Sequence, residues 1–124
     1  MKKILLIIDD EAMVRKALLS QFDQEQIEVL TASNGEEGLK LALDKHPDLI
    51  LLDLVMPKMD GMTMLGKLRQ DQWGKEAEVI ILTNLSDSKK VAEAVEQDTY
   101  EYLVKVGWNV SDVVKKVKAK LELS

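Results

Sequence analysis

The chain has 124 residues, of which 46% are hydrophobic and 31% are charged, and its formal net charge is −5 at pH 7. This length suits a single domain with one hydrophobic core. The sequence has no cysteine and one histidine, His46, which excludes disulfides, cysteine nucleophiles, thiolate zinc sites and multi-histidine metal sites. A net negative charge without a basic stripe also disfavours direct binding to nucleic acid, because phosphate backbones require clustered Lys and Arg.

The first residues do not resemble a targeting signal. Two lysines and five apolar residues lead directly into Asp9 and Asp10, whereas a signal peptide needs a longer apolar stretch and a small-residue cleavage site. No apolar run elsewhere approaches the length of a membrane span. We therefore expect a cytoplasmic protein with no membrane partner.

Short apolar runs recur along the chain and end in polar residues. Runs of this length that are apolar throughout are typical of strands buried on both faces of a sheet. The sequence predicts such strands at Ile4–Ile8, Ile27–Thr31, Asp48–Leu52, Val79–Leu82 and Tyr100–Val104.

Amphipathic stretches with helical spacing follow each of these runs. Asn34, with Glu37 three residues later, is typical of a helix N-terminus. The alternation predicts an α/β fold: one domain, residues 1–124, with a doubly wound five-stranded parallel sheet, right-handed crossovers and helices on both faces. The predicted core-facing stripes are Val14, Ala17, Leu18 and Phe22; Leu39, Leu41 and Ala42; Met62, Leu65 and Leu68; Val91, Ala94 and Val95; and Val110, Val113, Val114, Val117 and Leu121.

Polar residues mark the carboxyl ends of four of the predicted strands. Asp9 and Asp10 end the first strand and Asp53 ends the third. Thr83 ends the fourth strand and Lys105 the fifth. Because ligands of open parallel sheets bind outside the carboxyl ends of the strands, we expect these side chains to converge on one crevice.

This combination of residues is suited to phosphoryl chemistry. Closely packed carboxylates repel one another unless a cation lies among them, and oxygen ligands favour a hard cation such as Mg²⁺. Lys105 can meet an anion as a point charge, and the Thr83 hydroxyl can donate a hydrogen bond to it. An aspartate beside a cation, a lysine and a hydroxyl can attack phosphorus to give an aspartyl phosphate.

Each of these residues also has an ordinary structural explanation when taken alone. The acidic pair can simply separate a strand from a helix, Asp53 can be a solvated strand end, and Thr83 and Lys105 are common strand-end and surface residues. The functional interpretation depends on the whole set falling at strand ends in the expected order.

A longer motif joins this set. The segment Asp53-Leu-Val-Met-Pro-Lys-Met-Asp-Gly61 is very close to the Asp-x-x-Met-Pro-x-Met-Asp-Gly motif of response regulator receiver domains, and the acidic pair, Thr83 and Tyr102-Leu-Val-Lys105 match in order and spacing. The chain therefore resembles the receiver domain of two-component systems, of the chemotaxis-type single-domain kind, over nearly its whole length. The resemblance implies the flavodoxin-like strand order 2-1-3-4-5.

The resemblance also implies roles for individual residues. Asp53 corresponds to the phosphoacceptor, and Asp10, Asp53 and the Val55 carbonyl correspond to Mg²⁺ ligands, with Asp9 contributing directly or through water. Lys105 corresponds to the partner of the phosphoryl group. Thr83 corresponds to the switch hydroxyl, and Tyr102 resembles the aromatic residue that turns inward when that hydroxyl moves.

The implied function is a signalling switch. A histidine kinase or phosphotransfer protein would donate the phosphoryl group, and a separate downstream effector protein would sense the change. The chemistry of the chain itself would be limited to self-phosphorylation from phosphodonors and autodephosphorylation. Because the last helical stripe runs almost to Ser124, we expect either a separate effector or a longer regulator of which this sequence is a part.

Three positions depart from the family pattern. Val106 stands where the family usually has proline, Asn84 where it commonly has a small residue, and Asp98-Thr99 where it often has Gly-Ala.

Two other functions remain open: an inert receiver-like interaction module, and an aspartate-nucleophile phosphatase. The phosphatase usually carries a second aspartate two residues after its nucleophile, where this chain has Val55. Labelling by a small phosphodonor and turnover of a phosphate ester would separate the three.

Overall fold

A computed structural model describes most of the chain. The side chains of Thr83 and of residues 101–104 are not part of this description. Val55, Lys105 and the helix predicted around Val91–Val95 lie outside the described residues, so the predictions made for them are not tested. The described ranges are 2–23, 25–54, 56–83, 101–104 and 110–122.

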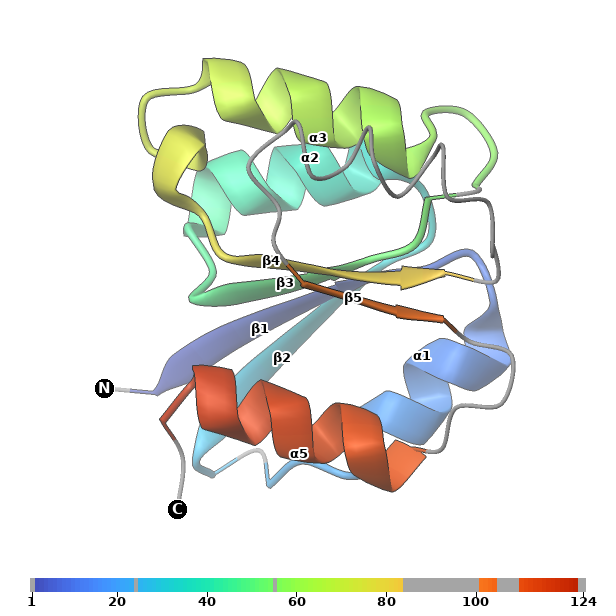
Figure 1. Ribbon diagram of the computed structural model, residues 1–124, viewed down its shortest axis with the longest axis vertical. Helices are drawn as coiled ribbons and strands as arrows, with labels where there is room; N and C mark the ends of the chain where they lie inside the picture. Colours follow the sequence, from blue (N-terminus) through green and yellow to red (C-terminus); the bar gives the residue numbers. More distant parts are fainter. Residues whose placement is uncertain (1, 24, 55, 84–100, 105–109, 123–124) are drawn as a thin grey trace.

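From residue 3 to residue 83, strands and helices alternate along the chain, as the sequence predicts (Figure 1). The strands are β1 (Lys3–Ile8), β2 (Ile27–Ala32), β3 (Leu49–Leu52), β4 (Val79–Thr83) and β5 (Glu101–Val104). The helices are α1 (Ala12–Leu19), α2 (Gly35–Lys45), α3 (Gly61–Gln70), the 3₁₀ turn η1 (Gly74–Glu76) and α5 (Val110–Lys120). None of the helices in these ranges is long and apolar enough to span a membrane.

The strands pair in parallel in the order β2-β1-β3-β4, which confirms the predicted parallel α/β architecture for these four strands. β5 is aligned beside β4, with Tyr102 opposite Ile81 and Val104 opposite Thr83 along the backbone. Because parallel pairing directs the carboxyl ends of the strands to one edge, the described segments that follow β1, β2 and β3 begin at that edge.

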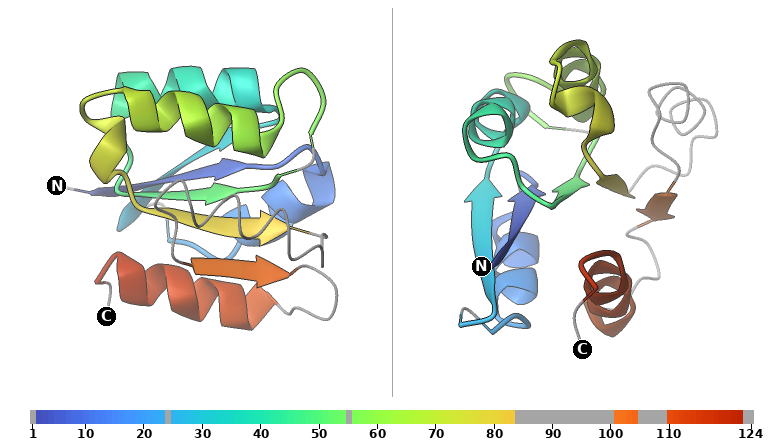
Figure 2. Two further views of the ribbon diagram at one scale, coloured as in Figure 1. Left: turned by 45° about the horizontal axis from the view of Figure 1, so that its top comes forward. Right: turned by 90° about the vertical axis from the view of Figure 1, so that its left-hand side faces the viewer.

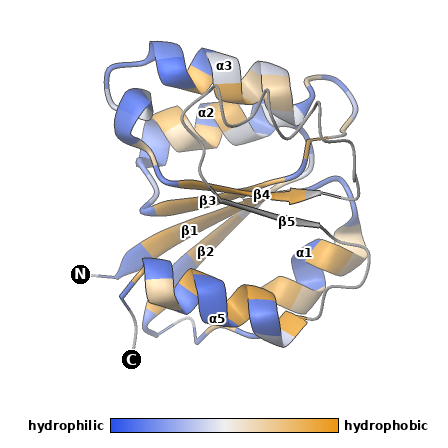
Figure 3. Cartoon of the chain, viewed as in Figure 1, coloured by the Kyte–Doolittle hydropathy of each residue, from blue (hydrophilic) through white to orange (hydrophobic). Residues whose placement is uncertain are grey.

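Helices cover both faces of the sheet: α2 and α3 lie on one face, and α1 and α5 on the other (Figure 2). Successive side chains of β1 point to opposite faces of the sheet, and each face is buried under helices. This explains why the strand sequences are apolar throughout. Leu6 and Ile8 pack under α2 and α3, whereas Leu5 and Ile7 pack under α1 and α5, and all four are fully buried. The sheet is accordingly the most hydrophobic layer of the molecule (Figure 3).

Two local predictions have different outcomes. The capping prediction is confirmed, because Asn34 Oδ1 accepts a hydrogen bond of 2.9 Å from the Glu37 amide at the start of α2. The extension of the first helical stripe to Phe22 is wrong, because α1 ends at Leu19. The Phe22 amide donates to the carbonyl of Leu19, three residues earlier, so the chain tightens into a turn that still buries the ring.

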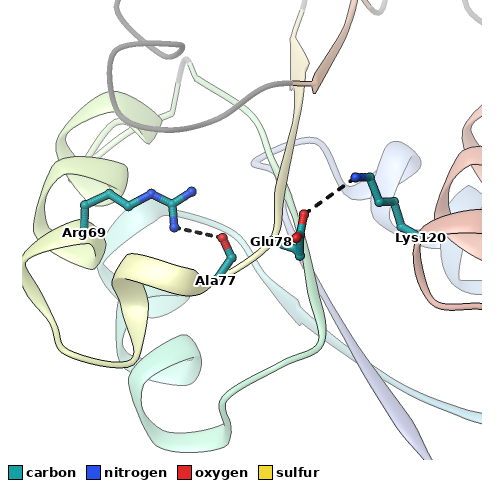
Figure 4. A network of polar contacts seen from close by, with 4 residues as sticks. All are labelled: Arg69, Ala77, Glu78 and Lys120. Carbon is teal, nitrogen blue, oxygen red and sulfur yellow. Dashed lines mark hydrogen bonds and ion pairs between the residues drawn. The ribbon is translucent and has the colours of Figure 1, made fainter.

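The segment that leads into β4 is held from both sides (Figure 4). Arg69 of α3 donates through Nη1 to the carbonyls of Gly74 and Ala77, at 2.7 and 2.8 Å. On the other side, Lys120 of α5 lies 3.7 Å from the Glu78 carboxylate in a largely exposed pair. The hydrogen bonds of Arg69 satisfy partly buried carbonyls, whereas the ion pair is open to solvent.

We predict that Arg69→Ala lowers the free energy of unfolding by about 2 kcal/mol, because it removes charge-assisted hydrogen bonds and leaves carbonyls without their donor. Lys120→Ala should cost less than about 0.5 kcal/mol, as expected for an exposed ion pair. Urea denaturation of both variants measures the difference, and equal losses would contradict this interpretation.

Candidate functional site

The register between β1 and β3 places two aspartates side by side at the carboxyl edge. Ile8 pairs with Leu52, so Asp9 and Asp53 follow their strands at the same level of the sheet. The ladder continues past the strand ends, because the Asp53 amide donates to the Ile8 carbonyl at 2.9 Å and the Asp9 amide donates to the Ala32 carbonyl at 3.0 Å. The backbone under both carboxylates is therefore fixed by the sheet itself.

Asp10 joins these two residues in one acidic cluster. One carboxylate oxygen from each of Asp9, Asp10 and Asp53 lies within 4.8 Å of the others. Asp9 is 1% exposed and Asp53 is 4% exposed, whereas Asp10 is exposed to solvent. The structure thus brings together the three acidic residues that the sequence predicted, with Asp10 on the solvent side.

The β1–α1 turn holds the first part of the cluster through contacts that the sequence interpretation did not include. Asp9 Oδ1 accepts a hydrogen bond of 2.9 Å from the Glu11 amide, and Arg15 Nη1 donates to the Asp9 carbonyl at 2.6 Å. Arg15 lies in α1 one turn after Glu11, which is the N-cap residue. Its position near the start of the helix after the acidic pair is the signal that could have pointed to this contact.

The start of α3 supports Asp53 from the other side. Asp60 is the N-cap and accepts a hydrogen bond of 2.8 Å from the Thr63 amide, while the Gly61 amide donates to the Leu54 carbonyl at 3.0 Å. A Cβ atom at Gly61 would lie 2.7 Å from the Leu54 Cα and would overlap the Asp53 carbonyl oxygen. Position 61 therefore requires glycine because the helix begins directly against the Asp53 backbone.

The remaining predicted site residues are placed only in part. Thr83 ends β4, the neighbour of β3, and Tyr102 lies in β5, but their side chains are not described. Lys105 and Val55 lie outside the described residues. Their predicted roles therefore stay predictions.

The donor set of the cluster fits a hard divalent cation. All three groups offer carboxylate oxygens, and two of them are almost fully buried, so their mutual repulsion is poorly screened by water. One oxygen of each carboxylate lies within 4.8 Å of the others, so a single small cation placed among them could contact oxygens from more than one carboxylate.

Comparison with known proteins identifies relatives over most of the chain. Residues 5–118 match the family model of the response regulator receiver domain. The transcriptional regulatory protein SrrA of Staphylococcus aureus is 36% identical over 121 residues, which cover 98% of this chain and 48% of the relative. The chain thus spans about half the length of this curated relative.

Two solved structures are similar in fold. The receiver domain of AraT, a response regulator from Geobacillus stearothermophilus, has a TM-score of 0.80 and 34% identity, and the match covers 98% of this chain and 97% of that one. The CheX–CheY–BeF₃–Mg²⁺ complex from Borrelia burgdorferi has a TM-score of 0.82 and 28% identity, and the match covers 94% and 87% of the two chains.

We predict opposite effects of Asp10→Asn on stability without and with Mg²⁺. In EDTA the variant should melt about 3 °C higher than the wild type, because one of three repelling charges is gone. The wild type should gain about 1.4 kcal/mol at a Mg²⁺ concentration ten times the dissociation constant, and the variant should lose most of this gain. Asp44→Asn, at the far end of α2, is the control that should keep the full Mg²⁺ effect. Thermal melts that show the same Mg²⁺ effect in all three proteins would exclude a cation at this cluster.

Proposed function

Since this chain belongs to the response regulator receiver domain family, we propose that it is a phosphorylation-dependent switch in which Asp53 is the phosphoacceptor. The observation that carries the proposal is the buried Asp53 carboxylate at the end of a central strand, beside two further carboxylates. The phosphoryl donor would be a phosphohistidine of a histidine kinase or phosphotransfer protein. We further propose that residues 1–124 form one cytoplasmic domain.

The cofactor in this proposal is Mg²⁺. Asp10, Asp53 and the Val55 carbonyl would hold the ion, with Asp9 contributing directly or through a water molecule. The bound ion would neutralise charge between the carboxylates and the incoming phosphoryl oxygens. The presence of Mg²⁺ in the related Borrelia burgdorferi complex supports this assignment.

The proposed transfer needs one nucleophile and two groups that stabilise the negative charge on the phosphoryl oxygens. A carboxylate oxygen of Asp53 attacks phosphorus, the phosphorus–nitrogen bond to the donor imidazole breaks, and the leaving nitrogen keeps the electron pair. Lys105 would meet one phosphoryl oxygen as a point charge and Thr83 would donate a hydrogen bond to another. Attack of water on the same phosphorus later releases phosphate and restores Asp53.

The output in this proposal is a change in the affinity for a separate effector protein. The full sheet order would be 2-1-3-4-5, with β5 at the edge, so that Thr83 and Tyr102 occupy neighbouring strands. A phosphoryl group adds about two negative charges and strong acceptor oxygens near Thr83. Movement of that hydroxyl would open space for the Tyr102 ring and reshape the surface that the effector binds.

We predict that Asp53→Asn abolishes labelling by radiolabelled acetyl phosphate while the thermal melt stays cooperative. The amide lacks the nucleophilic charge, and Asp44→Asn should be labelled as the wild type is. Full, acid-stable labelling of the Asp53 variant would contradict the assignment. A wild type that is never labelled indicates an inert interaction module, and rapid turnover of a generic phosphate ester indicates a phosphatase.

We predict that Thr83→Ala is labelled at Asp53 to nearly the same extent as the wild type but loses most of the gain in partner affinity. A tenfold gain corresponds to about 1.4 kcal/mol, which a single lost hydrogen bond can remove. Pull-down with phosphorylated and unphosphorylated protein, followed by titration of the retained partner, gives both affinities. A variant that keeps the full gain would exclude Thr83 as the coupling residue, and Asn84 would be the next candidate.

A further inference from the structure

The first turn of α2 contacts both chain segments that carry the acidic cluster. At its start, the Gly35 amide donates to the Met59 carbonyl at 2.9 Å, and Met59 lies in the loop between Asp53 and α3. One turn later, Gly38 lies against Ile8, the residue before Asp9.

The two glycines permit these approaches to different degrees. A Cβ atom at position 35 would lie 2.9 Å from the Met59 carbonyl carbon and 3.1 Å from its Cβ, and would overlap the carbonyl oxygen. For a Cβ atom at position 38 the three nearest atoms all belong to the side chain of Ile8, with Cδ1 at 2.5 Å. The close approach at position 38 is to a buried side chain, whereas the approach at position 35 is to the main chain of the loop. Only the contact of Gly35 therefore acts directly on the backbone path of the loop that follows Asp53.

The two ends of the loop that Gly35 contacts are held by the sheet and by the start of α3. The Asp53 amide donates to the Ile8 carbonyl, and the Gly61 amide donates to the Leu54 carbonyl. The hydrogen bond from the Gly35 amide to the Met59 carbonyl is thus a direct main-chain contact through which α2 can act on the path of the loop. The α2 start is itself fixed, because Asn34 is buried and caps it.

We propose that Gly35 is a positioning residue for the acidic cluster: because it lacks a Cβ atom, α2 begins against the Met59 carbonyl and sets the path of the loop that follows Asp53. The inference rests on the proposed function, in which this loop supplies the Val55 carbonyl to Mg²⁺. Residues that orient metal ligands typically contribute about 10- to 100-fold to metal affinity.

The chain offers matched control variants for this proposal. A Cβ atom at Gly74 would lie 2.9 Å from the Leu68 carbonyl carbon, which is a comparable backbone clash between α3 and η1. At Gly66, in the middle of α3, a Cβ atom would have nothing within 4 Å. Gly74→Ala thus controls for lost stability, and Gly66→Ala controls for the added methyl group.

The experiment measures the half-saturating Mg²⁺ concentration in wild type, Gly35→Ala, Gly74→Ala and Gly66→Ala. Calorimetric titration and the Mg²⁺ dependence of labelling by acetyl phosphate give it independently, at a temperature where each protein is folded. We expect an increase of about tenfold for Gly35→Ala and no change for the two controls. Equal values for Gly35→Ala and Gly74→Ala would overturn the proposal.

Hydrogen exchange of the wild type provides a second test that holds even where Gly35→Ala does not fold. Coupling between two sites is reciprocal, so an ion that depends on the Gly35–Met59 contact must also stabilise that contact. Mg²⁺ should slow exchange of the Gly35 amide more than that of the Gly74 amide, which donates to Asp71 Oδ2. Equal slowing of both amides would overturn the proposal. Mg²⁺ binding without labelling would instead contradict the proposed function and leave this result standing.

Discussion

The parallel pairing of β1 with β3 is the constraint on which the site depends. Because Ile8 lies opposite Leu52, the next residue of each strand is an aspartate at the same edge, and both are almost fully buried. Two carboxylates in this position repel each other more strongly than they would in water. The fold tolerates this cost because the strands beneath are held by a core on each face, under α2 and α3 and under α1 and α5.

The supports around the cluster explain how such a charged group keeps a defined geometry. Arg15 binds the Asp9 carbonyl from α1, and Gly61 lets α3 begin against the Asp53 backbone. These contacts act on main-chain atoms, and one carboxylate oxygen of each aspartate lies within 4.8 Å of the others. Groups held in this way need little rearrangement when a ligand arrives, which is the property that a binding or phosphoryl-transfer site requires.

Much of this arrangement could be predicted from the sequence, because it follows from patterns that are local to the chain. Apolar runs such as Leu5–Ile8 indicate strands buried on both faces, and the carboxyl-end rule for parallel sheets then brings Asp9 and Asp53 together. The contact of Gly35 with Met59 and the turn that buries Phe22 could not be predicted in this way. Both depend on how separate elements pack, and a glycine in a sequence gives no sign of the atom it approaches.

In the proposed function, binding of a cation and binding of a phosphoryl group at this edge would be linked. Without a cation, a phosphoryl group would add about two negative charges to a site that already has three carboxylates. With a divalent cation among them, part of that repulsion becomes attraction between the ion and the phosphoryl oxygens. Linkage is reciprocal for binding free energies, so if a bound cation favours an anion at this edge, the anion tightens binding of the cation by the same factor. Asp10 is the exposed member of the cluster, so a change in its charge acts on the buried pair from the solvent side.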